Sequence, residues 1–174
     1  MTKEVLTVQE NGRSIEYTYA DLVKYHGHGY LGGVALAFKA MQRGLPLLAD
    51  GQPPERNEIA LDTAFPGPGG RDGFEMVTRM VSSGRYKVDF SIAGADVPKS
   101  PTGSYFFRFK YRGRTVDLAL CPGIVREEFL RLARQEKLTP EEATRLEELK
   151  ADMADRLLAQ PAEALFDISP RVGA

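Results

Sequence analysis

The chain has 174 residues, of which 43% are hydrophobic and 27% are charged, and its net charge is −1. This length is enough to bury one substantial core and too short for two large domains to be expected. The balanced charge gives no general attraction to nucleic acid or to anionic lipid, and no apolar run approaches the roughly 20 residues needed to cross a bilayer. We therefore expect a cytoplasmic protein that binds neither nucleic acid nor membrane.

The cysteine count limits the chemistry further. Cys121 is the only cysteine in the sequence, so an intrachain disulfide and a multi-cysteine zinc or iron–sulfur site within one chain are excluded. Any chemistry must then use histidine, carboxylates or hydroxyls.

The first third of the chain predicts a short strand followed by two helices. Residues 13–18 alternate polar and apolar and indicate an edge strand, and residues 19–25 have a helical pattern that stops at a glycine-rich turn. From Tyr30 to Arg43 apolar residues recur at intervals of three and four, and Gly44 stands where a helix terminator belongs. The apolar stripe consists of Val34, Ala37, Phe38 and Met41.

The middle of the chain alternates strands with one further helix. Residues 58–63 predict a buried strand, and the proline- and glycine-rich loop 65–71 leads into a helix marked by Phe74, Val77 and Val81. Residues 86–92 predict another strand. The clearest hairpin pairs residues 105–111 with residues 114–120 and places alternate aromatic side chains on one face.

The last quarter of the chain predicts a helical hairpin. Thr139 is the expected N-cap of its second helix, with Pro140 at the first helical position and Glu142 completing a capping box. The apolar stripe of this helix is Leu146, Leu149, Met153 and Leu157. We therefore predict an α+β fold, an antiparallel or mixed sheet packed with helices, in residues 1–122. A helical extension in residues 123–174 would pack on this core or on a dimer partner.

The two histidines suggest a metal site. They occur together as His26-Gly27-His28, and glycine between them gives the backbone freedom to turn two imidazoles onto one ion. Because a stable site usually needs three protein ligands, a further ligand must come from elsewhere, and Asp62 and Asp72 are the best placed. The alternative is that one histidine caps a helix while the other is exposed to solvent.

Two other segments have compositions that could bind a ligand. The loop FPGPGG opens a helix and could hold an anion, although its spacing matches neither a Walker loop nor a dinucleotide fingerprint and an ordinary turn is the simpler interpretation. The segment YFFRFKYRGR interleaves aromatic and basic residues as base-stacking sheets do. The same pattern is normal for an antiparallel strand with one buried face.

The stretch DLVKYHGHGYLGGVALAFKAM resembles the signature of the formylmethanofuran dehydrogenase E-subunit family, in which His-Gly-His leads into Cys-Pro-Gly and an apolar helix. His26, Gly27, His28 and Gly32 fit this pattern. The next block is similar to Leu61-Asp62-Thr63 followed by Gly69 to Asp72, and the segments GRTVDLAL and QPAEALFDIS resemble the closing elements of the core. The resemblance covers most of residues 15–169 and includes no counterpart of the family's C-terminal zinc finger.

The resemblance implies an α+β core, a dimer, and a metal or active-site pocket built from histidine and cysteine. Family members are also associated with gene neighbourhoods of molybdenum or tungsten enzymes. The pocket carries over at His26, His28, Asp62 and Asp72. The family's cysteines are replaced by Tyr30, Gly69 and Met80, which argues against thiolate chemistry.

Three functional hypotheses follow. In the first, a homodimer binds a divalent metal (zinc, nickel or iron) or a metal-bearing cofactor through His26 and His28, with Asp62 or Asp72 completing the site, and metal-activated water supplies any catalysis. In the second, a metal-free module holds a small organic ligand with Tyr30 and the glycine-rich turns that include Gly32. In the third, the chain is an accessory or chaperone protein for a larger redox enzyme.

Overall fold

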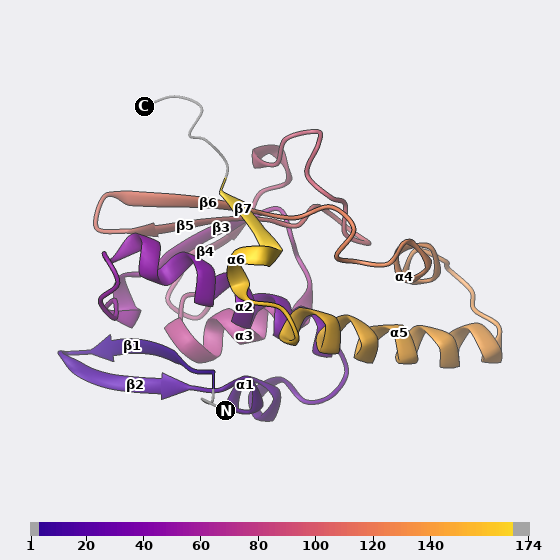
Figure 1. Cartoon of the computed structure of the whole chain (residues 1–174), viewed down its shortest axis with the longest axis horizontal. Coiled ribbons are helices and arrows are strands. Elements are labelled where there is room, and N and C mark those ends of the chain that lie inside the picture. The colour runs from indigo at the N-terminus through magenta and orange to yellow at the C-terminus, as the bar shows by residue number, and fades with distance from the viewer. Residues whose placement is uncertain (1–3, 169–174) are drawn as a thin grey trace.

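A five-stranded mixed sheet forms the centre of the computed structural model, which describes residues 4–168 (Figure 1). The strand order is β4-β3-β5-β6-β7, with β3 and β4 parallel and the other neighbours antiparallel. The strands are β3 (Ala60–Thr63), β4 (Tyr86–Val88), β5 (Phe106–Tyr111), β6 (Arg114–Leu120) and β7 (Phe166–Ile168). The α+β class predicted from the sequence is confirmed.

Two helices, α2 (Leu31–Leu48) and α3 (Pro68–Thr78), cover one face of this sheet, and α1 (Tyr19–His26) packs on these two helices on the side away from the strands. The central helix, α2, is buried along most of its length and packs on α1, α3, β5 and β6. Alternate residues of β3 and β5 point toward the helices, so that Leu61, Phe107 and Phe109 are fully buried in the main core. A strand with one buried face alternates in this way because its side chains have a period of two.

A separate two-stranded hairpin packs at the helical side of the molecule (Figure 1). It consists of β1 (Leu6–Glu10) and β2 (Arg13–Tyr17), joined by Asn11 and Gly12, which both have positive φ angles as a two-residue hairpin turn requires. The sequence predicted β2 but not β1. The Asn-Gly dipeptide was the signal for the missing strand.

The opposite face of the sheet is partly covered by the segment after β4 (Figure 1). Residues 86–92 were predicted as one strand, but β4 ends at Val88 and a short 3₁₀ helix, η2 (Phe90–Ile92), follows. The Asp89 side chain accepts a hydrogen bond from the Ser91 backbone amide at 3.0 Å, which caps η2 and turns the chain. A second 3₁₀ helix, η1 (Arg56–Glu58), precedes β3.

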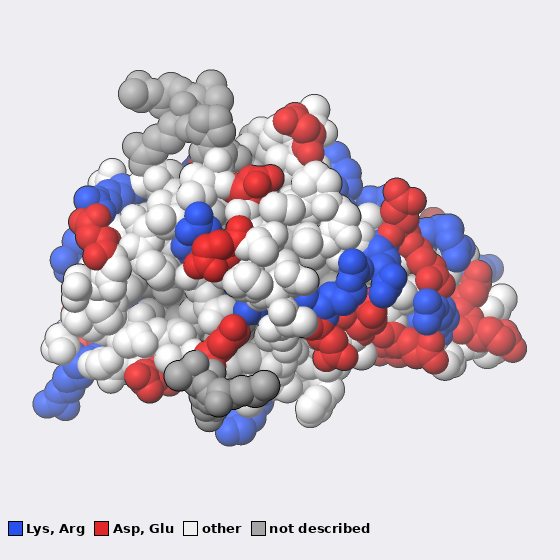
Figure 2. Space-filling model, in the orientation of Figure 1, with Lys and Arg blue, Asp and Glu red and all other residues white. Residues whose placement is uncertain are grey.

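The predicted helical hairpin is present as α4 (Glu127–Ala133) and α5 (Pro140–Leu158). The half of α5 nearer to residue 158 packs along α2, and the ion pair of Arg145 with Glu128, at 2.9 Å, joins α5 to α4. Acidic and basic side chains gather over this hairpin in Figure 2. Beyond it, α6 (Ala162–Leu165) leads into β7, so the described end of the extension is an edge strand of the core sheet.

Three helix boundaries differ from the prediction. Helix α3 ends at Thr78, before Val81, because Arg79 takes a left-handed conformation. Helix α2 continues past Gly44 to Leu48, and a Cβ atom at Gly44 would lie 2.9 Å from the Phe109 ring. Gly44 therefore makes room for the sheet and does not end the helix. Helix α3 begins at Pro68, inside the predicted loop, because proline is favoured in the first turn.

Candidate functional site

Two of the predicted site residues, His26 and Asp72, form a direct pair. His26 is the last residue of α1, and its Nδ1 lies 2.7 Å from Oδ2 of Asp72 in α3. The His26 side chain is 8% exposed and the Asp72 side chain 30% exposed. A carboxylate that accepts a hydrogen bond from one imidazole nitrogen fixes the ring and leaves the other nitrogen to act as acceptor, base or metal ligand.

His28 does not join this pair. It lies in the turn between α1 and α2 and is exposed, and the Gly27 between the two histidines has a φ angle of 90°. Within residues 4–168 no group of three or more His, Cys, Asp or Glu side chains is arranged to hold a metal ion. The described donors therefore do not fit the three-ligand site that the sequence suggested, and metal binding stays a prediction.

Asp62 lies on the other face of the sheet. Its neighbour Leu61 points into the core, so Asp62 points away from the helices, where it forms an ion pair with Lys110 of β5. The sheet thus separates Asp62 from His26 and Asp72.

Tyr30 and Gly32, predicted to hold an organic ligand, both line a cavity of about 390 Å³. The cavity lies between the N-termini of α2 and α3, the α4–α5 hairpin and the loop 101–102. Its apolar wall consists of Phe65, Pro101, Phe129, Ala133, Leu146 and Met153.

Glycines let α2, α3 and α5 approach one another closely enough to form this cavity. A Cβ atom at Gly69 would lie 2.4 Å from the Tyr30 carbonyl oxygen, and one at Gly32 would lie 2.7 Å from the Met153 sulfur. Both distances are far below van der Waals contact, so the start of α3 can cross α2 only without a side chain at residue 69. The glycine-rich segments thus serve close helix packing at the cavity floor.

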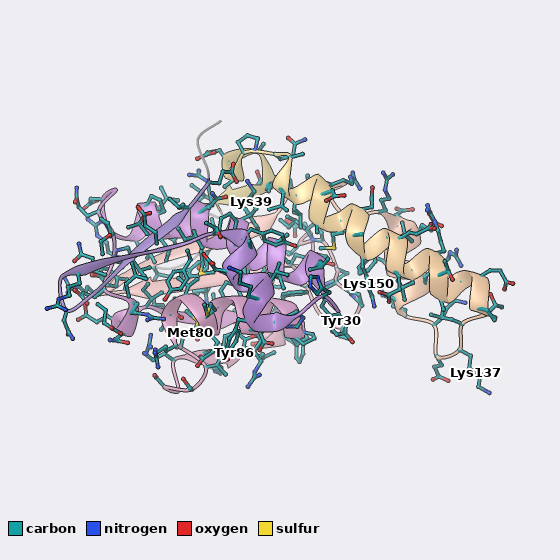
Figure 3. The ribbon with its side chains drawn as sticks, turned by 90° about the horizontal axis from the view of Figure 1, so that it is seen from below. Tyr30, Lys39, Met80, Tyr86, Lys137 and Lys150 are labelled. Carbon is teal, nitrogen blue, oxygen red and sulfur yellow. The ribbon has the colours of Figure 1, made fainter. Side chains whose placement is uncertain are left out.

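Few polar side chains line the cavity. Lys150 of α5 is 22% exposed, and its Nζ lies 4.9 Å from the centre of the Tyr30 ring and 2.7 Å from Glu147 Oε1. Figure 3 shows Tyr30 and Lys150 where α5 meets the start of α2. The pair of His26 and Asp72 is close by, since the rings of Tyr30 and His26 have centroids 6.0 Å apart.

Tyr105 is the most buried polar residue of the cavity. It is 1% exposed, its ring contacts Phe65 with centroids 5.2 Å apart, and its hydroxyl has no hydrogen-bond partner among residues 4–168. The hydroxyl is not one of the fully enclosed unpaired atoms of this part of the chain, and Tyr105 lines the cavity, so we place the accessible surface of the hydroxyl at the cavity. Burial raises the pKa of Tyr105 well above its usual value, which keeps the hydroxyl protonated and available as a donor.

Lys150 and Tyr105 were not predicted as site residues from the sequence. Lys150 stands between Leu146 and Met153 in the apolar stripe of α5, at helical spacings of four and three, and a lysine within such a stripe was an available signal. Tyr105 was assigned to the aromatic face of the sheet, and nothing in its sequence position distinguishes a packed tyrosine from one that borders a cavity.

Comparison with known proteins adds no relative. A scan against models of protein families finds no match to this chain, and a search of curated proteins finds no match either. The resemblance to the formylmethanofuran dehydrogenase E-subunit family therefore rests on the quoted motifs alone.

Proposed function

We propose that this protein binds a small organic molecule in the cavity between α2, α3 and the α4–α5 hairpin. The observation that carries the proposal is the cavity itself, which has an apolar wall and only a few polar groups. Small-molecule sites have this composition, because apolar walls supply affinity while a few placed polar groups fix orientation. The volume of about 390 Å³ suits a compact ligand with one or two rings.

The placement of Tyr30 and Gly32 also supports the proposal. Both belong to the segment that was predicted to hold an organic ligand, and both lie at the cavity beside Met153 and Lys150. Bringing these residues together requires contacts between segments more than 100 residues apart in the sequence, and glycine at positions 32 and 69 makes this approach sterically possible.

Binding can be tested with four compounds that share one ring and differ in head group: phenylacetate, phenylacetamide, 2-phenylethylamine and phenyl phosphate. We expect at least one to bind with a dissociation constant of about 1 mM or lower. Its binding should shift the NMR signals of the Met153 methyl, Leu146 methyls and Gly32 amide.

A filled-cavity variant provides the control. Ala133→Phe places a ring in the cavity wall and should abolish binding, whereas Ala151→Phe adds the same ring at an exposed position of α5 outside the cavity and should not. If no compound binds, or if binding is equal in both variants, the proposal is wrong.

Metal binding is a second candidate function, favoured by the hydrogen bond between His26 and Asp72. Metal-ligating histidines are commonly oriented by a carboxylate in this way. Elemental analysis of protein purified without an affinity tag, after supplementation with zinc, nickel and iron, tests it. About one metal per chain that is lost in the His26→Ala/His28→Ala variant would support this function, and equally metal-free parent and variant would exclude it.

The other sequence-based hypotheses also need experiments. Membership of the formylmethanofuran dehydrogenase E-subunit family, a homodimer, a cytoplasmic location and an accessory role beside a larger redox enzyme all stay predictions. As to membranes, none of the helices in residues 4–168 combines the length and apolar character that a bilayer span needs.

A further inference from the structure

We infer that the ligand is a small organic acid whose single carboxylate lies among Tyr105, Lys150 and the N-termini of α2 and α3, with its apolar body against the aromatic wall. This inference rests on the proposed function and specifies the chemical class of its ligand.

Two helix N-termini border the cavity without an acidic residue in their first turns. Neither α2 nor α3 has a side-chain N-cap hydrogen bond or an acidic residue in its first turn, and Tyr30, Gly32, Gly67 and Gly69 from these two ends line the cavity. By contrast, α1 and α5 have capping boxes with acidic residues in the first turn. The unpaired amides and positive dipole ends of α2 and α3 therefore favour an anion between them.

Tyr105 provides an independent indication of a ligand. Its side chain is almost completely buried, yet its hydroxyl opens onto the cavity and has no hydrogen-bond partner in the described part of the chain. A donor that no described protein group satisfies is available to a ligand. A carboxylate oxygen in the cavity would accept this hydrogen bond in place of water.

Lys150 supplies the one positive side-chain charge among the described residues that line the cavity. Its ammonium group has three N–H donors, of which Glu147 Oε1 accepts one at 2.7 Å, so at least one more is available to a ligand. The Tyr30 ring beneath the ammonium holds it at the cavity rim.

The charged side chains of the lining indicate a ligand with one negative charge. Among the described residues, the lining contains no aspartate or glutamate that would repel an anion, and no arginine that would grip a phosphate with two parallel hydrogen bonds. Arg134 lies outside the lining, close enough to oppose the rise in the Tyr105 pKa, and it donates to the Ser100 carbonyl oxygen at 3.0 Å. One lysine, shared with Glu147, and a neutral phenol suit a carboxylate better than a phosphate dianion. The rings of Phe65, Phe129 and Tyr105 then suit an aromatic or branched apolar body.

The four compounds with one ring test this assignment directly by isothermal titration. We expect phenylacetate to bind at least about 10-fold more tightly than phenylacetamide, which has almost the same shape and no charge, and 2-phenylethylamine to bind most weakly. If phenylacetamide binds as tightly as phenylacetate, or if the amine or phenyl phosphate binds more tightly, the carboxylate inference is overturned while the cavity remains a ligand site. If none binds, the proposed function fails and the inference fails with it.

Variants identify the groups involved. Tyr105→Phe keeps the ring and its contact with Phe65, and should weaken phenylacetate binding about 10-fold while changing phenylacetamide binding less. Lys150→Met should also weaken phenylacetate binding, and Lys150→Arg should restore most of it. Lys137→Met removes the same charge at the far end of the hairpin (Figure 3) and should have no effect. Equal effects of the Lys150→Met and Lys137→Met variants would show that only long-range charge matters and would contradict the inference.

Discussion

Among single residues, the pair of His26 and Asp72 fixes one imidazole tautomer. The Asp72 carboxylate only accepts hydrogen bonds, so His26 Nδ1, at 2.7 Å, must carry the proton and Nε2 is the unprotonated nitrogen of the neutral ring. We predict that long-range ¹H–¹⁵N spectra will show this tautomer at His26 and that Asp72→Ala will abolish the preference. The exposed His28 is an internal control whose tautomer ratio should not change. Identical ratios for both histidines in the parent protein would contradict the pairing.

An ion pair between the buried Lys39 of α2 and the half-exposed Glu4 gives a second prediction for individual residues. The Lys39 side chain is completely buried, and its Nζ lies 2.9 Å from Oε2 of Glu4. Because Glu4→Gln leaves a buried ammonium without its countercharge, we expect it to lower the free energy of unfolding by about 2 kcal/mol. Lys39→Met keeps an apolar side chain of similar length and should remain within about 1 kcal/mol of the parent.

Urea denaturation of both single variants and the double variant separates the two effects. In the Lys39→Met background the Glu4→Gln substitution should change stability little, since no buried charge remains to be compensated. The same loss in both backgrounds would mean that Glu4 acts through contacts other than Lys39.

Among the secondary-structure elements, the crossing of α2 and α3 depends on glycine at residue 69. An alanine there would place Cβ 2.4 Å from the Tyr30 carbonyl oxygen and 3.0 Å from the Val34 amide nitrogen, both backbone atoms that cannot rotate away. We predict that Gly69→Ala lowers the free energy of unfolding by about 2–3 kcal/mol. Gly29→Ala is the matched control, since nothing lies within 4 Å of its Cβ position, and it should be close to neutral. Thermal denaturation that gives similar midpoints for both variants would refute the tight crossing.

The N-terminus of α1 should be sensitive to acid. Thr18 and Asp21 form a capping box, and the hydrogen bonds from the Thr18 backbone and hydroxyl to Asp21 hold the pKa of this carboxyl below its usual value. Ionised Asp21 therefore contributes stability that is fully present above the unfolded-state pKa of about 3.9 and is lost as the pH falls through the lower folded-state pKa.

Thermal melts of Asp21→Asn and the parent between about pH 6 and pH 2.5 test this contribution. The variant should be less stable than the parent at the upper end of this range, and the difference should shrink toward the acidic end. A difference that is constant across the range would show that the charge of Asp21 is not involved.

Much of the structure of individual elements could be predicted from local patterns. The β5–β6 hairpin follows from alternating aromatic residues, and the start of α5 follows from Thr139, Pro140 and Glu142, whose capping box is present in the structure. The end of α2 could not be predicted, because Gly44 has the composition of a helix terminator but packs against Phe109. Only the tertiary contact distinguishes these two roles of glycine.

The candidate site was predictable only in part for the same reason. Sequence position suggested that His26, His28, Asp62 and Asp72 share one site, but Asp62 is separated from the others by the sheet, which a one-dimensional pattern does not show. The grouping of Tyr30 with Gly32 survives because both lie at one helix start. Lys150 and Tyr105 reach the same cavity through long-range packing, which the sequence does not specify locally.

In the molecule as a whole, the cavity lies where the sheet, the N-termini of α2 and α3, and the α4–α5 hairpin meet. Each contributes a different property: Tyr105 supplies a hydroxyl beside the sheet, α2 and α3 supply positive helix ends, and α5 supplies Lys150. The hairpin closes the cavity with Phe129 and Leu146, so it borders the proposed ligand site as well as extending the core. We therefore predict that a ligand contacts both the core and the hairpin at once.

Intermolecular nuclear Overhauser effects between phenylacetate and the isotope-labelled protein would decide whether one ligand contacts both parts. We predict effects from the ligand ring to the Met153 and Leu146 methyls of α5 and also to the Phe65 and Tyr105 rings of the core, all lost in Ala133→Phe. Effects confined to residues outside this set, or unchanged in Ala133→Phe, would contradict a ligand site in this cavity.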